Sequence, residues 1–191
     1  MKKIERRGIP IVFSAPSGAG KTTIIRLIEP KLRGLGYSVS ATTRPKSDQE
    51  VDGKDYFFLS TKEFLKKKRL GEFVETANVH GHYYGTLKTQ LDKQLDSGFD
   101  VLMDIDVIGA RNVKKLYPRS LMIFIVPPSM KILGERLRKR GRDSERAIRK
   151  RLVNAKKELR YKKYYDYVIV NDDLGTAGRE IEKILRTERK K

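Results

Sequence analysis

The sequence predicts an α/β fold in which a parallel sheet is flanked by helices, and three observations support this. Short apolar runs alternate with helical patterns along most of the 191 residues. One of these runs, at 121–126, carries no polar residue, which is typical of a strand buried on both faces. A glycine-rich turn separates the first apolar run from the first helical stretch, as in a strand–loop–helix unit.

Each strand of the main sheet is an apolar run, and each helix follows an apolar spacing with start and stop signals. The strands are expected at 9–14, 37–41, 100–106, 121–126 and 166–170. The helices are expected at 22–32, 60–71, 88–95, 107–117, 130–138, 145–162 and 176–189. Ser60 and Glu63 have capping-box spacing, which predicts the start of the second helix.

The segment from residue 42 to residue 86 breaks this alternation. A polar loop is expected at 44–54 and a short aromatic strand at 55–59. Residues 72–79 and 83–86 alternate like exposed antiparallel strands. We therefore expect an inserted lobe that carries a second binding site.

The composition favours one domain and argues against several classes of protein. The chain has no Cys, so neither a disulfide framework nor a Cys-based zinc site is expected. No run of 18 apolar residues is present, and the N-terminal residues lack a signal-peptide pattern, so we expect a cytoplasmic protein with no membrane partner. The net charge of +19 attracts polyanions. Without a helix-turn-helix, zinc-finger or aromatic RNA-binding motif, we expect no specific nucleic-acid partner.

The glycine-rich turn has the pattern of a phosphate-binding P-loop. Residues 15–22 read Ala-Pro-Ser-Gly-Ala-Gly-Lys-Thr, with Ala15 in place of the usual first Gly. Backbone N–H groups of such a turn point at one phosphate, and the following helix N-terminus adds partial positive charge. Lys21 can reach the terminal phosphates of a nucleoside triphosphate, and the Thr22 hydroxyl can bind the accompanying Mg²⁺. The alternative is an ordinary glycine-rich turn.

Two carboxylates follow the apolar run that begins at residue 100. Asp104 and Asp106 stand at its C-terminal end, where open α/β sheets bind ligands. Asp104 resembles the Walker B carboxylate and is predicted to bind Mg²⁺ through water. Within a strand the two side chains would share a face. The alternative is a pair of ordinary loop carboxylates.

A basic segment at 131–151 is the third candidate feature. Arginine side chains stabilise the charge that develops during phosphoryl transfer. Most of the segment is expected to be a solvated helical face, whereas Arg140 and Arg151 are candidates for phosphate contact.

Further motifs accompany the P-loop, in this order along the chain: Ser40-Ala-Thr-Thr-Arg44, Gly53-Lys-Asp-Tyr56-Phe-Phe, Phe73-Val-Glu75, Tyr83-Tyr84-Gly85-Thr86, Asp104-Ile-Asp106, Pro127-Pro128-Ser129, Arg140-Gly141 and Val168-Ile-Val-Asn171-Asp-Asp. In order and spacing they resemble the motifs of the guanylate kinase family. The resemblance runs from about residue 9 to residue 186. A P-loop alone is common to many NTPases, but the motifs of the inserted lobe are specific to this family.

The resemblance implies transfer of the γ-phosphoryl group of ATP to GMP, with Mg²⁺ as the cofactor of ATP, in purine nucleotide metabolism. It implies one guanylate-kinase-like domain over 1–191, with a P-loop NTPase core at 1–41, 97–137 and 151–191. The GMP-binding lobe would be 42–96 and the lid 138–150. GMP would be bound, with dGMP as a further acceptor. The sequence leaves open whether the protein forms a homo-oligomer.

The resemblance also implies roles for individual residues. The catalytic residues would be Lys21, Arg44, Arg140 and Arg151. ATP would be bound by Ser17, Gly18, Ala19, Gly20, Lys21, Thr22, Thr23 and Asn171. GMP would be bound by Ser40, Arg44, Tyr56, Glu75, Tyr84, Thr86 and Asp106, where Glu75 and Asp106 would read guanine. Guanine presents N1–H and a 2-amino group as adjacent donors, which a carboxylate accepts. The tyrosines could instead only pack the small lobe.

Two positions depart from the family pattern. Ser47 stands where a second arginine is usual, with Lys46 beside it, and Ile108 stands where a glutamine is usual. His80 and His82 lack a visible third ligand, so no metal site is expected there. The alternative functions are a related P-loop kinase acting on a sugar phosphate such as ribose 1,5-bisphosphate, a peptide-binding scaffold domain and a nucleic-acid binder. Glu75 and Asp106 argue against the first, and the intact Gly20-Lys21-Thr22 argues against the second.

Overall fold

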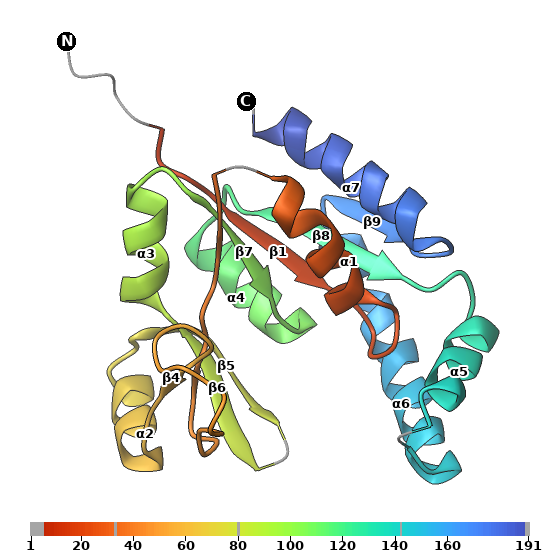
Figure 1. Ribbon diagram of the computed structural model, residues 1–191, viewed down its shortest axis with the longest axis horizontal. Coiled ribbons are helices and arrows are strands. Elements are labelled where there is room, and N and C mark those ends of the chain that lie inside the picture. The colour runs from red at the N-terminus through yellow and green to blue at the C-terminus, as the bar shows by residue number, and fades with distance from the viewer. Residues whose placement is uncertain (1–5, 33, 80, 142, 190–191) are drawn as a thin grey trace. The chain divides into compact units, whose positions relative to one another are not determined.

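The computed structural model describes residues 6–32, 34–79, 81–141 and 143–189 and contains two sheets (Figure 1). The larger sheet has the strand order β2-β7-β1-β8-β9. Its strands are β1 (Pro10–Ser14), β2 (Leu35–Tyr37), β7 (Asp100–Asp104), β8 (Leu121–Val126) and β9 (Tyr167–Val170). The smaller sheet has the order β4-β3-β6-β5. Its strands are β3 (Ala41–Thr42), β4 (Phe57–Phe58), β5 (Phe73–Val79) and β6 (His82–Leu87).

Helices separate most of the strands, as the alternating pattern predicts. The α-helices are α1 (Lys21–Ile28), α2 (Thr61–Arg69), α3 (Lys88–Asp96), α4 (Val107–Leu116), α5 (Met130–Lys139), α6 (Glu145–Glu158) and α7 (Leu174–Glu188). The pairings β2–β7 and β8–β9 are parallel. The predicted α/β fold, with a parallel sheet flanked by helices, is therefore confirmed.

The chain forms two compact units, which are described separately. The first unit comprises the described residues of 6–11, 34–103 and 108–120. The second unit comprises those of 12–32, 104–107 and 121–189.

In the first unit, a small aromatic core stabilises the four-stranded sheet. Strand β6 pairs antiparallel with β3 and with β5. Phe64 of α2 stacks on Phe73 of β5, with ring centroids 4.4 Å apart. The predicted capping box is present: the Ser60 hydroxyl accepts from the Glu63 N–H, and the Glu63 carboxylate accepts from the Ser60 N–H at 2.9 Å. This cap fixes where α2 begins.

In the second unit, β8 is buried along its whole length, as its wholly apolar sequence predicts. Helices α1 and α7 lie side by side, and α5 and α6 form an adjacent pair (Figure 1). The pair has its own apolar cluster, built from Leu133, Leu137, Ile148 and Ala155. A compact hairpin of this kind can hold charged side chains on its outer face.

Several predicted boundaries are wrong, and the largest error has a structural cause. Residues 37–41 do not form one strand, because the chain leaves β2 and enters β3 of the other sheet there. The Ser38 N–H still donates to Leu102 O at 2.9 Å, whereas Ser40 O already accepts from the Phe57 N–H at 2.9 Å. The aromatic strand shortens to β4, and the helix predicted to reach residue 162 becomes a 3-10 helix after Glu158. Strand β7 ends at Asp104, so the shared-face argument for Asp106 does not apply.

Candidate active site

The P-loop of the second unit joins β1 to α1, and no side chain caps the N-terminus of α1. Gly18 and Gly20 have φ of 95° and 94°, a region that side chains disfavour. Gly20 is the N-cap of α1. The first N–H groups of α1 are therefore left for an anion.

Lys21, the first residue of α1, is held at the end of β7. Its Nζ lies 2.5 Å from Asp104 Oδ1 and donates to Ile105 O at 3.2 Å. Both side chains are about one-fifth exposed, so solvent weakens the pair only partly. The sequence predicts Lys21 at the terminal phosphates of a nucleoside triphosphate and Asp104 near the accompanying Mg²⁺. The structure brings these two residues together.

A pocket of about 440 Å³ adjoins the P-loop, large enough for part of a nucleotide. Its lining joins the P-loop, α5 and the loop after β9: Gly18, Gly20, Thr23, Arg136, Lys139, Arg140, Asn171, Asp172, Asp173 and Leu174. Five of these are predicted site residues. The sequence reasoning missed Arg136 and Lys139, although Arg136 stands four residues before Arg140, a helical spacing that could have indicated it.

The side chain of Asn171 is buried beneath the P-loop, and the residue is only 2% exposed. Its Nδ2 donates to Ala19 O at 2.6 Å. The Asn171 carbonyl accepts from Arg136 Nη1 at 2.9 Å. The predicted ATP-binding residue is therefore in contact with the P-loop backbone.

Helix α6 contacts the P-loop at Ser17. Arg151 Nη1 donates to Ser17 Oγ at 3.1 Å, and its Nη2 pairs with Asp143 at 3.2 Å. The Glu158 carboxyl faces the Ser17 N–H, and its Oε2 is buried without a hydrogen-bond partner among the described residues. Burial raises the pKa of Glu158, and the Asp106 charge adds to this, while the Ser17 N–H acts against it. The sequence pattern gave no signal for Glu158.

The residues beside the P-loop fit Mg²⁺ if substrate phosphates complete its coordination. Among the described residues, no group of three or more acidic or His side chains could hold a metal ion by itself. The Thr22 side chain is exposed at the start of α1, and Asp104 is half-buried beside Lys21. Mg²⁺ commonly keeps several waters and uses one or two protein ligands with substrate phosphates, which matches this donor set.

The first unit contains a buried carboxylate on its small sheet. Glu75 of β5 is 8% exposed, and its Oε1 accepts from Thr86 Oγ1 of β6 at 2.9 Å. The two residues are register partners in the antiparallel pair. A Cβ on Gly109 would lie 3.2 Å from Glu75 Oε2, so the backbone of α4 approaches the carboxylate closely. Such a fixed acceptor suits a ligand with paired N–H donors.

A second cluster surrounds Arg44, in the loop after β3. Its guanidinium carbon is 5.3 Å from the centroid of the Tyr56 ring, which meets the Tyr84 ring edge-on at 5.9 Å. The guanidinium also pairs with Glu50, whose Oε2 accepts from the Ser47 N–H at 2.9 Å. The hydrogen bond from Arg44 lowers the pKa of Glu50 to about 2, and the Ser47 N–H adds to the shift. The sequence reasoning missed Glu50, because three other acids in the same loop gave it no distinctive signal.

The remaining candidates fall at different places. Ser40 precedes β3 in the first unit, whereas Asp106 lies exposed in the second unit. Ile108 is 53% exposed. His82 is half-buried at the start of β6, and His80 lies outside the described residues.

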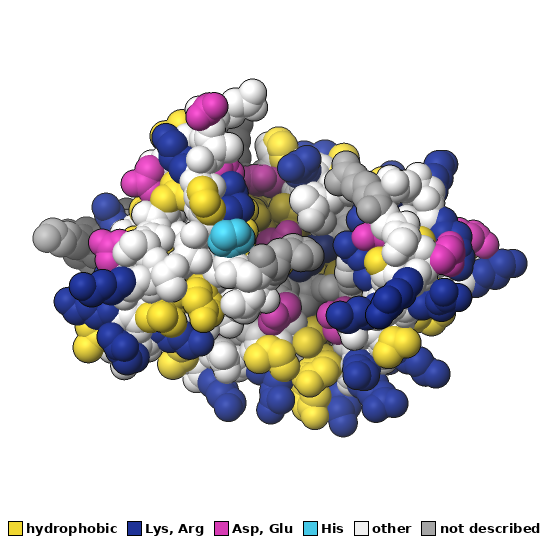
Figure 2. Space-filling view, turned by 90° about the horizontal axis from the view of Figure 1, so that it is seen from below, with side chains coloured by type: hydrophobic (Ala, Val, Ile, Leu, Met, Phe, Trp, Pro, Cys, Tyr) yellow, Lys and Arg dark blue, Asp and Glu magenta, His cyan; other side chains and the backbone are white. Residues whose placement is uncertain are grey.

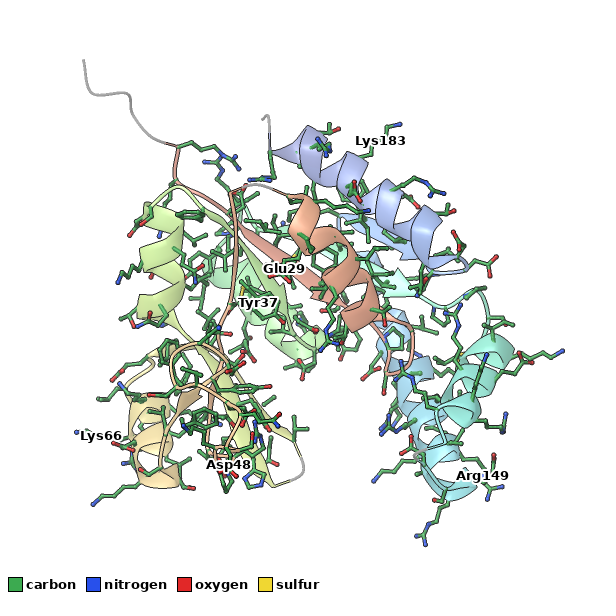
Figure 3. The ribbon with its side chains drawn as sticks, viewed as in Figure 1. Glu29, Tyr37, Asp48, Lys66, Arg149 and Lys183 are labelled. Carbon is green, nitrogen blue, oxygen red and sulfur yellow. The ribbon has the colours of Figure 1, made fainter. Side chains whose placement is uncertain are left out.

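Basic side chains are spread over the face seen in Figure 2 rather than gathered at one point. In Figure 3, Lys66, Arg149 and Lys183 extend outward from their helices, as a solvated basic face predicts. In the described part of the chain, no helix combines the length and apolarity needed to span a membrane.

Comparison with known proteins places these features in one family. Residues 7–188 match the family model described as guanylate kinase. The chain is 47% identical over 185 residues to a guanylate kinase of Thermotoga maritima, covering 97% of this chain and 89% of that protein. It is 50% identical over 178 residues to one of Nitratidesulfovibrio vulgaris, covering 93% and 86%. A crystal structure of guanylate kinase from Anaplasma phagocytophilum superimposes with a TM-score of 0.75 at 34% identity, covering 98% of this chain and 89% of that one.

Proposed function

The chain belongs to the guanylate kinase family, and we propose that it transfers the γ-phosphoryl group of ATP to a phosphate oxygen of GMP, giving ADP and GDP. The observation that carries the proposal is the buried Glu75 carboxylate held by Thr86. Guanine offers two adjacent donors to such an acceptor, whereas ribose 1,5-bisphosphate has no base. Nothing in the comparisons favours the sugar-phosphate alternative.

On the donor side, the P-loop N–H groups and Lys21 would bind the ATP phosphates. Lys21 would exchange Asp104 for a phosphate oxygen, because its ammonium group pairs with Asp104 in this structure. Arg140 and Arg151 would neutralise the charge that develops on the transferred group. Arg151 already lies at the P-loop, in contact with Ser17.

On the acceptor side, Arg44, Tyr56 and Tyr84 would bind the GMP phosphate, because their side chains already form one cluster. Glu75 and Thr86 would bind the base. The role of Asp106 at guanine stays a prediction. Ser40 would complete the site. Deoxy-GMP differs from GMP only at the 2′-hydroxyl, and we propose it as a second acceptor.

Mg²⁺ would enter with ATP and would neutralise charge between its phosphates. Thr22 would bind it directly and Asp104 through water. We propose the core, lobe and lid boundaries given above, with the lobe at 42–96 and the lid at 138–150. We place the reaction in the cytoplasm and in purine nucleotide metabolism, where ATP and GMP meet.

A coupled assay of ADP release tests this proposal. GMP, AMP, UMP and ribose 1,5-bisphosphate are offered in turn as acceptors, with ATP and Mg²⁺ in excess. We expect turnover with GMP at least a hundredfold above the other three, because a hydrogen-bonding site rejects ligands that lack its partners. Equal or greater turnover with the sugar phosphate would overturn the assignment. Omission of Mg²⁺ should abolish the activity.

A further inference from the structure

The peptide between Ala19 and Gly20 is held in one orientation by a single side chain. Asn171 Nδ2 donates to Ala19 O at 2.6 Å, and the bond is buried. A trans peptide is planar, with its C=O and N–H on opposite sides. Because the Ala19 carbonyl faces Asn171, the Gly20 N–H must point the other way. That N–H belongs to the turn that presents donors to an anion.

The contact is close enough to fix the position of the turn as well. A Cβ on Gly20 would lie 2.2 Å from Asn171 Nδ2. Gly20 also has φ of 94° and ψ of 14°, a conformation that turns the chain into α1. The amide of Asn171 therefore fills the space that any larger residue at position 20 would need.

Asn171 is itself firmly anchored. Its backbone N–H donates to Val126 O at 2.8 Å, and its carbonyl accepts from Arg136 Nη1 at 2.9 Å. Its Oδ1 is buried without a partner among the described residues. A buried unpaired acceptor costs free energy, and the opposite amide orientation would set two oxygens against each other at Ala19. Within the described part of the chain, only the donor half of the amide has a partner, and that partner is the P-loop.

We propose that Asn171 is a positioning residue for the phosphates of the donor nucleotide, because it aims the Gly20 N–H at them. The inference rests on the proposed function and deepens it. Asn171 then acts on the triphosphate through the P-loop backbone, whatever base the nucleotide carries. A contact with adenosine would make Asn171 sensitive to the base instead.

Calorimetric titration separates these roles, with ATP and inorganic tripolyphosphate as probes in the presence of Mg²⁺. Asn171→Asp places an acceptor against the Ala19 carbonyl, and Asn171→Ala removes the donor. We expect both variants to weaken ATP and tripolyphosphate by the same factor, about tenfold or more, with Asn171→Asp the weaker binder. Weakened ATP with unchanged tripolyphosphate would overturn the proposal.

Donor selectivity provides a second readout that does not need tripolyphosphate. If Asn171 positions the phosphates, the ratio of kcat/KM for ATP to that for GTP stays at the wild-type value in both variants, while both constants fall. A changed ratio would indicate a base contact and would overturn the proposal. This result is separate from a failure of the proposed function, which would appear as wild-type protein without GMP phosphorylation.

Asn112→Asp is the matched control, because Asn112 is exposed on α4, outside the unit that carries the P-loop. It makes the same chemical change and should leave both measurements at their wild-type values. Thermal unfolding of each nucleotide-free variant checks the fold. If Asn171→Asp does not fold, Asn171→Ala, which introduces no repulsion, decides the question alone.

Discussion

The two regions proposed to bind phosphate differ in the groups that they offer. In the second unit the P-loop offers backbone N–H groups, fixed by Gly18 and Gly20 at positive φ. In the first unit the Arg44 cluster offers side chains, which Glu50 and the tyrosine rings hold in place. A backbone cradle can be recognised from a short stretch of sequence, whereas a side-chain cluster depends on residues brought together by the small sheet. Substitutions in the donor region should therefore change the kinetic constants more than substitutions in the acceptor region.

The largest effect is expected from Lys21→Ala. Loss of the ammonium group at the transferred phosphate should lower kcat by about 10²–10³-fold, the usual cost of removing one preorganised charge-stabilising donor. The change is measured by steady-state kinetics, with thermal unfolding to show that the fold is intact. Lys183→Ala, on the outward face of α7 in Figure 3, should leave kcat unchanged. Near-normal turnover of a folded Lys21→Ala protein would contradict the assignment of residues 15–22 as a phosphate-binding P-loop.

Glu75→Gln should weaken GMP binding in the acceptor region and leave ATP binding in the donor region unchanged. Thr86 donates to the Glu75 carboxylate, and an amide in its place offers one acceptor oxygen and one NH₂ donor where guanine presents two donors. A buried mismatch of this kind costs about 1–3 kcal/mol, which is about tenfold or more in GMP affinity. Calorimetry should show weakened GMP and unchanged ATP analogues. Glu29→Gln, the same substitution at an exposed site, is the control; equal loss of both ligands by Glu75→Gln would contradict the assignment.

Ser47→Arg tests whether the acceptor region lacks a second arginine. A second guanidinium should lower KM for GMP, by about tenfold if it forms a charge-assisted hydrogen bond of about 1.5–3 kcal/mol. If Lys46 already contacts the phosphate, Ser47→Arg changes little and Lys46→Ala raises KM by a similar factor. Steady-state kinetics of the two single variants decides between these outcomes. If neither variant changes KM, this loop does not contact the GMP phosphate.

Glu50→Gln should have the smallest effect. The Glu50 carboxylate pairs with Arg44, the residue predicted to bind the GMP phosphate, so the substrate must compete with it. With the pKa of Glu50 lowered to about 2, this carboxylate is charged at neutral pH. Removing the charge should lower KM for GMP about two- to fivefold, the range of an exposed ion pair. A higher KM would mean that Glu50 orients Arg44 for the phosphate instead of competing with it.

A related pH dependence follows for the stability of the first unit. The folded-state pKa of Glu50 lies below its unfolded value near 4.5. The pair with Arg44 therefore stabilises the fold fully above about pH 4.5, and this contribution is lost as the pH falls toward 2. Between about pH 4.5 and pH 2, the free energy of unfolding should fall less with decreasing pH in Glu50→Gln than in the wild type.

The local features of this protein could be predicted from sequence, whereas contacts distant along the chain could not. The P-loop, β8 and the capping box at Ser60 each depend on neighbouring residues, and all three are found as expected. The split of residues 37–41 between two sheets depends on which strands they meet, and no local pattern records this. Glu158 was missed for the same reason, since the Ser17 N–H that it faces is distant along the chain. Glu50 was missed because three other acids share its loop, although its partner Arg44 is near in sequence.

The bond between Asn171 and Ala19 joins residues 152 positions apart, which has a consequence for synthesis on the ribosome. At about 5–20 residues per second, roughly eight to thirty seconds pass between translation of Ala19 and translation of Asn171. Throughout that interval the glycine-rich turn exists without the side chain that orients its peptide. The nascent chain should therefore become able to bind ATP only near the end of its translation. A chain that stalls or is cut before β9 should have the P-loop sequence but lack the P-loop conformation.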